Sequence, residues 1–142
     1  MTGASRCSTA GDALTFALWM ILAAAMLPYL TVGAAKFGGA GYDNAAPRQW
    51  TEGLQGWRRR MEWAHRNHFE AFPAFAAAVL VSYVTGVSEA ADWLAGAFVG
   101  LRVGYTAAYA ADRPGLRSVL WFLALACVIG LFTASSLADG AP

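Results

Sequence analysis

The chain is 142 residues long, and 58% of its residues are hydrophobic whereas only 13% are charged. Charged residues usually make up about 25% of a globular domain, and a soluble fold of this length leaves much of its surface in water. The formal net charge of +1 gives no basis for nucleic-acid binding. The composition therefore excludes an ordinary soluble domain and predicts a single integral membrane domain over residues 1–142.

The first hydrophobic segment covers residues 13–35 and contains no charged side chain. Because a helix rises about 1.5 Å per residue, about 20 apolar residues are enough to cross a bilayer. A cleaved signal peptide is the alternative interpretation, but the segment is longer than a typical signal core. We therefore expect a helix that stays in the membrane, followed by a polar, glycine-rich loop that ends at Glu52.

A second, long helix is predicted over residues 50–87. It begins with an amphipathic, basic stretch that we place at or above the membrane surface, and it continues as an apolar stretch in which Glu70 is the only charged residue. Pro73 removes one backbone hydrogen bond from this helix, which membrane helices tolerate.

The third and fourth helices are predicted over residues 90–111 and 115–137. Between them, Asp112 to Gly115 form a tight break, in which Pro114 suits the first turn of a new helix. The third segment is apolar apart from Asp92 and Arg102. Together the four segments predict an all-α membrane protein, a bundle of four transmembrane helices.

Basic residues are distributed unequally between the two ends of the predicted bundle. Arg6 is the only basic residue on the side of the termini, whereas the other side holds Lys36, Arg48, Arg58, Arg59, Arg60, Arg66, Arg113 and Arg117. The positive-inside rule therefore places the N and C termini on the non-cytoplasmic side. The Ala- and Gly-rich composition hints at a bacterial source, for which the cytoplasmic (inner) membrane is the natural location of a multi-pass helical protein.

Polar residues inside predicted membrane helices are costly and therefore indicate function. In the predicted second helix, the polar residues Arg60, Asn67 and Glu70 fall on one side. In the predicted third helix, Arg102, Tyr105 and Tyr109 are separated by three and four residues and therefore form one stripe. Arginines bind carboxylates in bidentate fashion, and a carboxylate accepts hydrogen bonds from an ammonium group. We expect a cationic pocket near the cytoplasmic face that binds an anionic ligand with an amine, built from Arg60, Arg66, Asn67, Glu70, Arg102, Tyr105, Tyr109 and Arg117.

Structural interpretations of the same residues remain open. Glu70 could pair with Arg66 or Arg102 only to hold two helices together, and the basic residues 58–60 could form a patch on anionic membrane lipid. We interpret His65 and His68 as surface or packing residues. No Cys/His spacing predicts a metal site, so no metal is expected.

Residues 67–75 (NHFEAFPAF) resemble the second-helix signature of the MAPEG family, the membrane-associated proteins of eicosanoid and glutathione metabolism. The stripe of Arg102, Tyr105 and Tyr109, the later Arg117, the four segments and the chain length are also similar to that family. The resemblance covers nearly the whole chain. Departures from the leukotriene synthase pattern are Trp63, where that pattern has arginine, and Ala71, where tyrosine is common.

The resemblance implies a homotrimer of four-helix bundles in which glutathione, as co-substrate, binds between neighbouring subunits near the cytoplasmic face. Asn67 and Glu70 match positions that hold the peptide part of glutathione, and Tyr105, Tyr109 and Arg117 match positions that complete the site. Where active members have an arginine that stabilises the thiolate, this chain offers Lys36. The thiolate is then expected to attack a hydrophobic electrophile dissolved in the bilayer.

Two functions are compatible with this resemblance. The favoured one is a membrane-embedded glutathione-dependent transferase or peroxidase that conjugates or reduces hydrophobic electrophiles. The alternative is a non-catalytic lipid-binding or scaffold protein, because the family contains a member of that kind. A small transporter subunit is a third and weaker interpretation, since the repeated broken helices of many transporters are missing from the sequence pattern.

Overall fold

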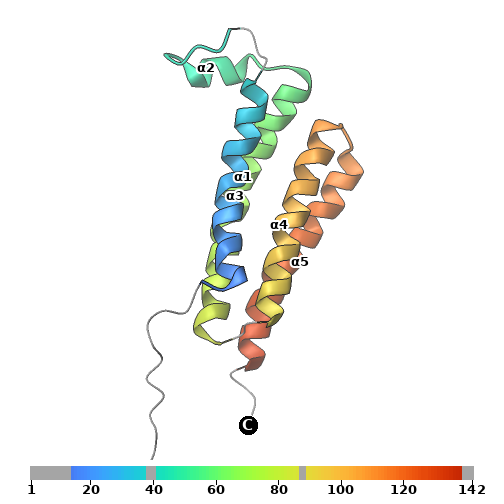
Figure 1. The fold of residues 1–142 in the computed structure, drawn as a ribbon. Coiled ribbons are helices and arrows are strands. Elements are labelled where there is room, and N and C mark those ends of the chain that lie inside the picture. The colour runs from blue at the N-terminus through green and yellow to red at the C-terminus, as the bar shows by residue number, and fades with distance from the viewer. Residues whose placement is uncertain (1–13, 38–40, 87–88, 139–142) are drawn as a thin grey trace, which may run out of the picture.

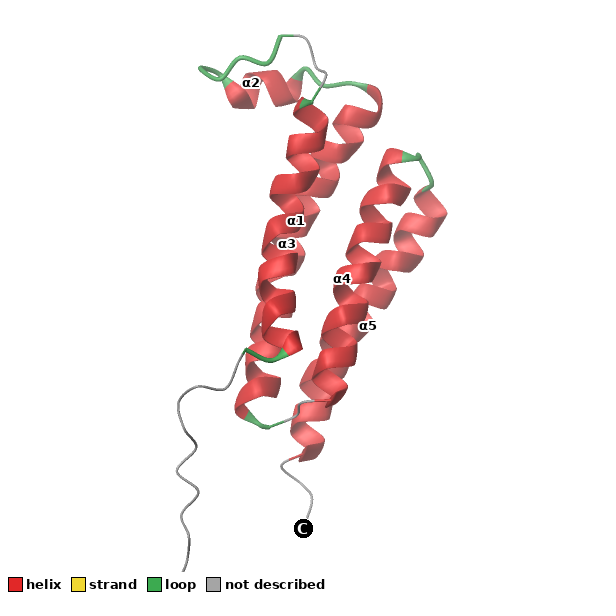
Figure 2. Cartoon of the chain, in the orientation of Figure 1, coloured by secondary structure: helices red, strands yellow, loops and turns green. Residues whose placement is uncertain are grey.

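The computed structural model describes residues 14–37, 41–86 and 89–138 of the chain. The predicted leader with Arg6, Cys7 and Asp12 and the polar C-terminal tail lie outside these residues. The described ranges contain helices and connecting turns but no strand, as Figure 2 shows. The helices are α1 (Phe16–Lys36), α2 (Pro47–Glu52), α3 (Gly56–Val84), α4 (Glu89–Ala110) and α5 (Pro114–Ala138).

The four long helices form two antiparallel pairs that pack against each other. Figure 1 shows α1 beside α3 in one pair and α4 beside α5 in the other, with the short helix α2 across one end. The turn between α4 and α5 lies at the same end as α2, whereas α1 begins and α5 finishes at the opposite end. Both predicted basic connections therefore lie at one end of the bundle, which we refer to as the basic end.

The predicted helix over residues 50–87 is divided in the structure. Pro47 opens α2, where its fixed φ suits the first helical position. The chain leaves the helical conformation at Gln55, which is extended, and Gly56 has a φ of +59°. Only glycine adopts this left-handed conformation without steric cost, so Gly56 lets α3 start in a new direction. The other long helices begin and end within a few residues of their predicted bounds.

The turn between α4 and α5 is closed by backbone hydrogen bonds typical of a helix C-terminus. The amide of Arg113 donates to the carbonyl of Ala108 at 2.9 Å, and the amide of Asp112 donates to the carbonyl of Tyr109 at 3.2 Å. Asp112 has a φ of +57°, a conformation that aspartate tolerates better than most residues. This closure returns the chain directly into α5 and keeps residue Arg117 at the basic end.

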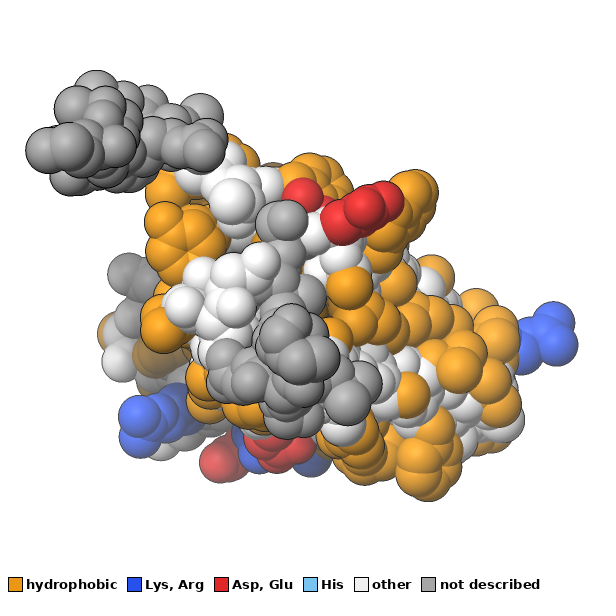
Figure 3. Space-filling model, turned by 90° about the horizontal axis from the view of Figure 1, so that it is seen from below, with side chains coloured by type: hydrophobic (Ala, Val, Ile, Leu, Met, Phe, Trp, Pro, Cys, Tyr) orange, Lys and Arg blue, Asp and Glu red, His pale blue; other side chains and the backbone are white. Residues whose placement is uncertain are grey.

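The interior is built from small and aromatic residues. Phe75 of α3 and Phe98 of α4 stack with ring centroids 3.9 Å apart, and both are buried. Leu131 of α5 is also completely buried. The surface is different: Figure 3 views the bundle from the end where α1 begins, and hydrophobic side chains cover much of this view, with charged side chains in small groups. Along the outer flank, large hydrophobic side chains such as Leu30 of α1 and Phe122 of α5 are exposed. Such a flank suits contact with lipid rather than with water.

Among the described residues, two helices are long and apolar enough to cross a membrane, α1 over Phe16–Lys36 and α5 over Pro114–Ala134. The helices α3 and α4 have sufficient length, at 29 and 22 residues, but they contain more charged residues. The most important of these charges, Arg102, is only 1% exposed. It faces the interior of the bundle and does not interrupt the apolar outer surface of α4.

Candidate functional site

Arg102 of α4 lies at the centre of a buried polar cluster between α3 and α4. Its Nε and Nη2 atoms donate to Nδ1 of His68 at 3.2 and 3.0 Å. Its Nη1 atom donates to the Oδ1 atom of Asn67 at 3.0 Å. Two consecutive residues of α3 therefore hold this guanidinium, which has a fixed fork of donors and stays charged.

His68 completes the cluster and was not among the predicted site residues. Because its Nδ1 accepts from Arg102, the hydrogen of a neutral ring sits on Nε2, which lies 2.8 Å from Oγ1 of Thr106. The hydroxyl of Thr106 donates in turn to the backbone carbonyl of Arg102. The ring is 3% exposed. The sequence pattern that could have indicated this role of His68 is the spacing of Arg102 and Thr106, which are four residues apart and therefore lie on one face of α4.

Glu70 lies at the exposed edge of the cluster. Its Oε2 atom accepts from Nδ2 of Asn67 at 3.0 Å. Among the described residues, Glu70 forms no ion pair with Arg66 or Arg102; Arg66 pairs with Glu62 instead. Asn67 thus bridges the buried guanidinium of Arg102 and the exposed carboxylate of Glu70. That carboxylate can accept a further hydrogen bond from a ligand.

The two tyrosines and Arg117 extend the cluster toward the basic end. The guanidinium of Arg102 lies 4.4 Å from the ring centroid of Tyr105, and the guanidinium of Arg117 lies 4.8 Å from that of Tyr109. The two tyrosine rings meet edge to face at 5.1 Å. Each cation is held over an aromatic ring, an interaction that leaves guanidinium hydrogens available to an anion.

Two cavities meet at this cluster. The first, of about 210 Å³, is mainly polar and is lined by Asn67, Tyr105, Tyr109, Arg117, Ser118, Trp121 and Phe122. The second, of about 190 Å³, starts at Asn67, Glu70 and Arg102 and continues between apolar side chains of α3, α4 and α5 as far as Val128. Asn67 and Trp121 line both. A polar recess near the basic end therefore adjoins an apolar groove within the bundle.

The sequence profile of the MAPEG family matches residues 16–137, which includes all five helices almost in full. The chain belongs to the MAPEG family. It is therefore a membrane protein, and its general role lies in glutathione or eicosanoid metabolism. No curated protein and no solved structure matches the chain.

Six of the predicted MAPEG site residues lie around these two cavities: Asn67, Glu70, Arg102, Tyr105, Tyr109 and Arg117. Arg60 does not line either cavity. Its Nε and Nη2 atoms donate to the carbonyls of Tyr109 and Ala110 at 2.9 and 3.1 Å, and its Nη1 atom lies 3.6 Å from Oδ2 of Asp112. Arg60 therefore caps the C-terminal end of α4, where a cation is favoured by the helix dipole.

Lys36 and Arg66 lie on the other side of α3, at a cavity formed with α1 and α2. The ammonium of Lys36 donates to the hydroxyl of Tyr42 at 2.9 Å. Neither residue lines the polar recess or the apolar groove. The predicted thiolate stabiliser and the predicted peptide-binding residues of this MAPEG protein are thus separated by α3.

Proposed function

We propose that this MAPEG protein is a membrane-embedded, glutathione-dependent transferase or peroxidase that acts on hydrophobic electrophiles. The observation that carries the proposal is the polar recess next to an apolar groove, with Asn67 and Trp121 lining both. A reaction between a soluble thiol tripeptide and an apolar electrophile requires two such compartments side by side.

The polar recess offers groups that complement glutathione, which carries an ammonium, two carboxylates and a thiol. The exposed carboxylate of Glu70 suits the ammonium, and Asn67 keeps this carboxylate oriented. Arg117 suits a carboxylate, because its guanidinium can donate two parallel hydrogen bonds. The hydroxyls of Tyr105 and Tyr109 can supply further hydrogen bonds to the bound peptide.

A cation close to the thiol favours the thiolate, which is the reactive form. Arg117 fills this role in the proposal, since it lines the polar recess. Lys36 can serve only a thiol that lies between two subunits, so its role depends on the proposed homotrimer.

In conjugation, the thiolate forms a carbon–sulfur bond while the electrophile takes up the proton or releases its leaving group. In the peroxidase reaction, two glutathiones become a disulfide while a hydroperoxide becomes an alcohol and water.

The apolar groove accepts the hydrophobic reactant. Phe98, Ala124, Leu125 and Val128 line it, and it opens beside the apolar outer face of α5. Holding both reactants in adjacent sites converts an encounter into an intramolecular step, which is a large part of enzymatic acceleration. The proposal includes four membrane-spanning helices, termini on the non-cytoplasmic side and, for a bacterial source, the inner membrane.

The proposal is tested by titrating glutathione into detergent-purified protein in a calorimeter. Saturable binding is expected, together with consumption of the thiol when a hydrophobic electrophile is added. Glu70→Ala and Arg117→Ala should lose binding, whereas Glu89→Ala and Arg113→Ala should retain it, because Glu89 at the start of α4 and Arg113 in the turn before α5 are both exposed. An absence of binding by folded wild-type protein would reject the transferase and favour the lipid-binding or scaffold alternative.

A further inference from the structure

Trp121 of α5 lies where the polar recess and the apolar groove adjoin, and the proposed function assigns it no contact with either reactant. Its side chain lines both cavities and is 37% exposed. Trp121 follows Arg117 by four residues, so the two side chains succeed one another along one face of α5. Asn67 also lines both cavities, but its side chain is bound to Arg102 and Glu70. Trp121 is therefore well placed to meet an electrophile that approaches the thiol.

The apolar groove owes its space to small side chains. Ala71 and Ala74 of α3 and Ala124 of α5 line it. Its volume is about 190 Å³. An apolar protein cavity of about 150 Å³ is known to bind benzene, whereas sites for drug-sized ligands begin at about 300 Å³. The groove therefore has room for one substituted ring or for a short chain.

Two aromatic side chains, Phe98 and Trp121, form part of the groove wall. Phe98 is buried and stacks on Phe75 with ring centroids 3.9 Å apart. Trp121 meets the ring of Phe122 edge to face at 5.0 Å. Both rings are thus supported by neighbours before a ligand arrives. A flat aromatic ligand gains stacking or edge contacts with such walls, whereas a flexible chain loses rotational freedom when it is bound.

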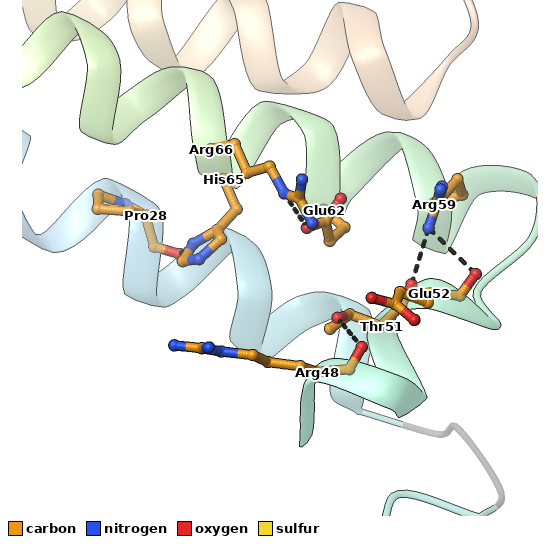
Figure 4. A network of polar contacts seen from close by, with 8 residues as sticks. All are labelled: Pro28, Arg48, Thr51, Glu52, Arg59, Glu62, His65 and Arg66. Carbon is orange, nitrogen blue, oxygen red and sulfur yellow. Dashed lines mark hydrogen bonds and ion pairs between the residues drawn. The ribbon is translucent and has the colours of Figure 1, made fainter. Parts of the chain in front are cut away.

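The cavity between α1, α2 and α3 is less suitable for an apolar reactant. Charged side chains from all three helices line it: Lys36, Arg48, Glu52, Glu62 and Arg66. Figure 4 shows how close these groups are to one another, with Arg66 paired to Glu62. An apolar electrophile would displace water from these charges and offer them nothing in return. The groove beside Trp121 is therefore the better site for the hydrophobic reactant.

We propose that Trp121 determines which electrophile this protein conjugates, and that it favours a compact aromatic electrophile over a flexible alkyl one with the same reactive group. This inference rests on the proposed function and concerns the same site. The ring of the electrophile packs against the indole of Trp121, and its reactive carbon meets the thiolate where the two cavities adjoin. With an isothiocyanate, the carbon–sulfur bond forms at the central carbon. The electron pair of the carbon–nitrogen π bond moves to nitrogen, which takes up the proton that the thiol released.

The test compares benzyl isothiocyanate with heptyl isothiocyanate, whose substituents have the same number of carbon atoms. Each kcat/KM of the detergent-purified protein, measured with saturating glutathione, is divided by the uncatalysed rate constant for the same compound. The wild type should favour the benzyl compound by about fivefold, as one aromatic contact does. Trp121→Leu should bring the ratio close to one, whereas Trp121→Phe keeps a ring and should retain most of the preference. Trp93→Leu is the matched control, because Trp93 is 73% exposed at the start of α4 and lines neither cavity.

The ratio between two substrates is insensitive to any loss of stability or of glutathione affinity that both substrates share. A second variant tests the groove itself. Ala74 is exposed, so Ala74→Phe is compatible with the fold while its ring occupies the groove. We expect this variant to bind glutathione and to lower kcat/KM for the benzyl compound by at least about tenfold, because the lost contacts are those of the whole reactant.

Three results would overturn the role of Trp121 while leaving the proposed function intact. They are equal ratios for the two compounds in the wild type, an aromatic preference that persists in Trp121→Leu, and an Ala74→Phe variant as active as the wild type. In each of these cases glutathione is still conjugated. Folded wild-type protein that conjugates neither compound and does not bind glutathione would instead reject the proposed function, and this inference with it.

Discussion

The guanidinium of Arg102 donates two of its hydrogen bonds to a single nitrogen, Nδ1 of His68. This contact connects α3 and α4 at the depth where the polar recess and the apolar groove meet. A neutral ring is required, because a protonated imidazole would present a hydrogen to the guanidinium. His68, together with Asn67, therefore fixes the position of the Arg102 side chain, and Asn67 connects this cluster to Glu70.

Replacing His68 by leucine should destabilise the bundle. The guanidinium of Arg102 would lose its main acceptor while remaining buried, and a buried donor without a partner costs about 1–3 kcal/mol, or more when it is charged. We expect a lower Tm in detergent and weaker glutathione binding. The double variant His68→Leu with Arg102→Met should recover part of the lost stability, because both polar partners are then absent. A single variant as stable as the wild type would contradict the proposed role of His68.

Arg60 should contribute to the stability of the folded protein and not to its affinity for glutathione. It caps the carbonyls of Tyr109 and Ala110, and a cation at a helix C-terminus contributes about 0.3–1 kcal/mol. Its ion pair with Asp112 adds little, because the Asp112 side chain is 70% exposed. We expect Arg60→Gln to lower Tm slightly and to leave glutathione affinity unchanged. Lower affinity at an unchanged Tm would restore Arg60 to the binding site that the sequence predicts.

Helix positions were predictable from the sequence where apolar runs end at charges, prolines or glycines. The division between α2 and α3 was not, because single glycines occur inside helices and the basic amphipathic pattern continues through Gly53 and Gly56. Gly56, with a φ of +59°, lies at the junction where α3 begins after α2 has ended. The pattern therefore predicts the helical content of this region correctly but not its change of direction.

The candidate site was predictable to the extent that its residues share a helix face. The stripe on α4 places Arg102, Tyr105 and Tyr109 together, and the structure has them together. The partners across helices were not predictable, because spacing along one helix does not define its rotation relative to a neighbour. For that reason His68 was interpreted as a packing residue, and Arg60 was assigned to the ligand instead of to the end of α4.

The close packing of α4 against α5 should be disrupted when Gly130 is replaced by a residue with a larger side chain. A Cβ atom there would lie 3.3 and 3.4 Å from the two methyl carbons of Leu94, whereas a Cβ atom at Gly100 would have no atom within 4 Å. We expect Gly130→Val to separate the two helices and to cost about 1–3 kcal/mol, as overpacking usually does. Gly100→Val is the matched control. Equal Tm values for the two variants would show that the helices do not approach as closely as described.

Lys36 and Arg117 are competing candidates for the cation that stabilises the thiolate, and they can be separated experimentally. Arg117 lines the polar recess, whereas Lys36 lines the cavity between α1, α2 and α3 and donates a hydrogen bond to Tyr42. We expect Arg117→Gln to reduce kcat/KM for glutathione by at least about tenfold, since a lost interaction with a charged group is worth about 1.5–3 kcal/mol. Lys36→Gln should change it by less than about twofold, as for a residue outside the site. The reverse order would mean that a neighbouring subunit brings its Lys36 to the thiol, and it would favour the proposed homotrimer with a shared site.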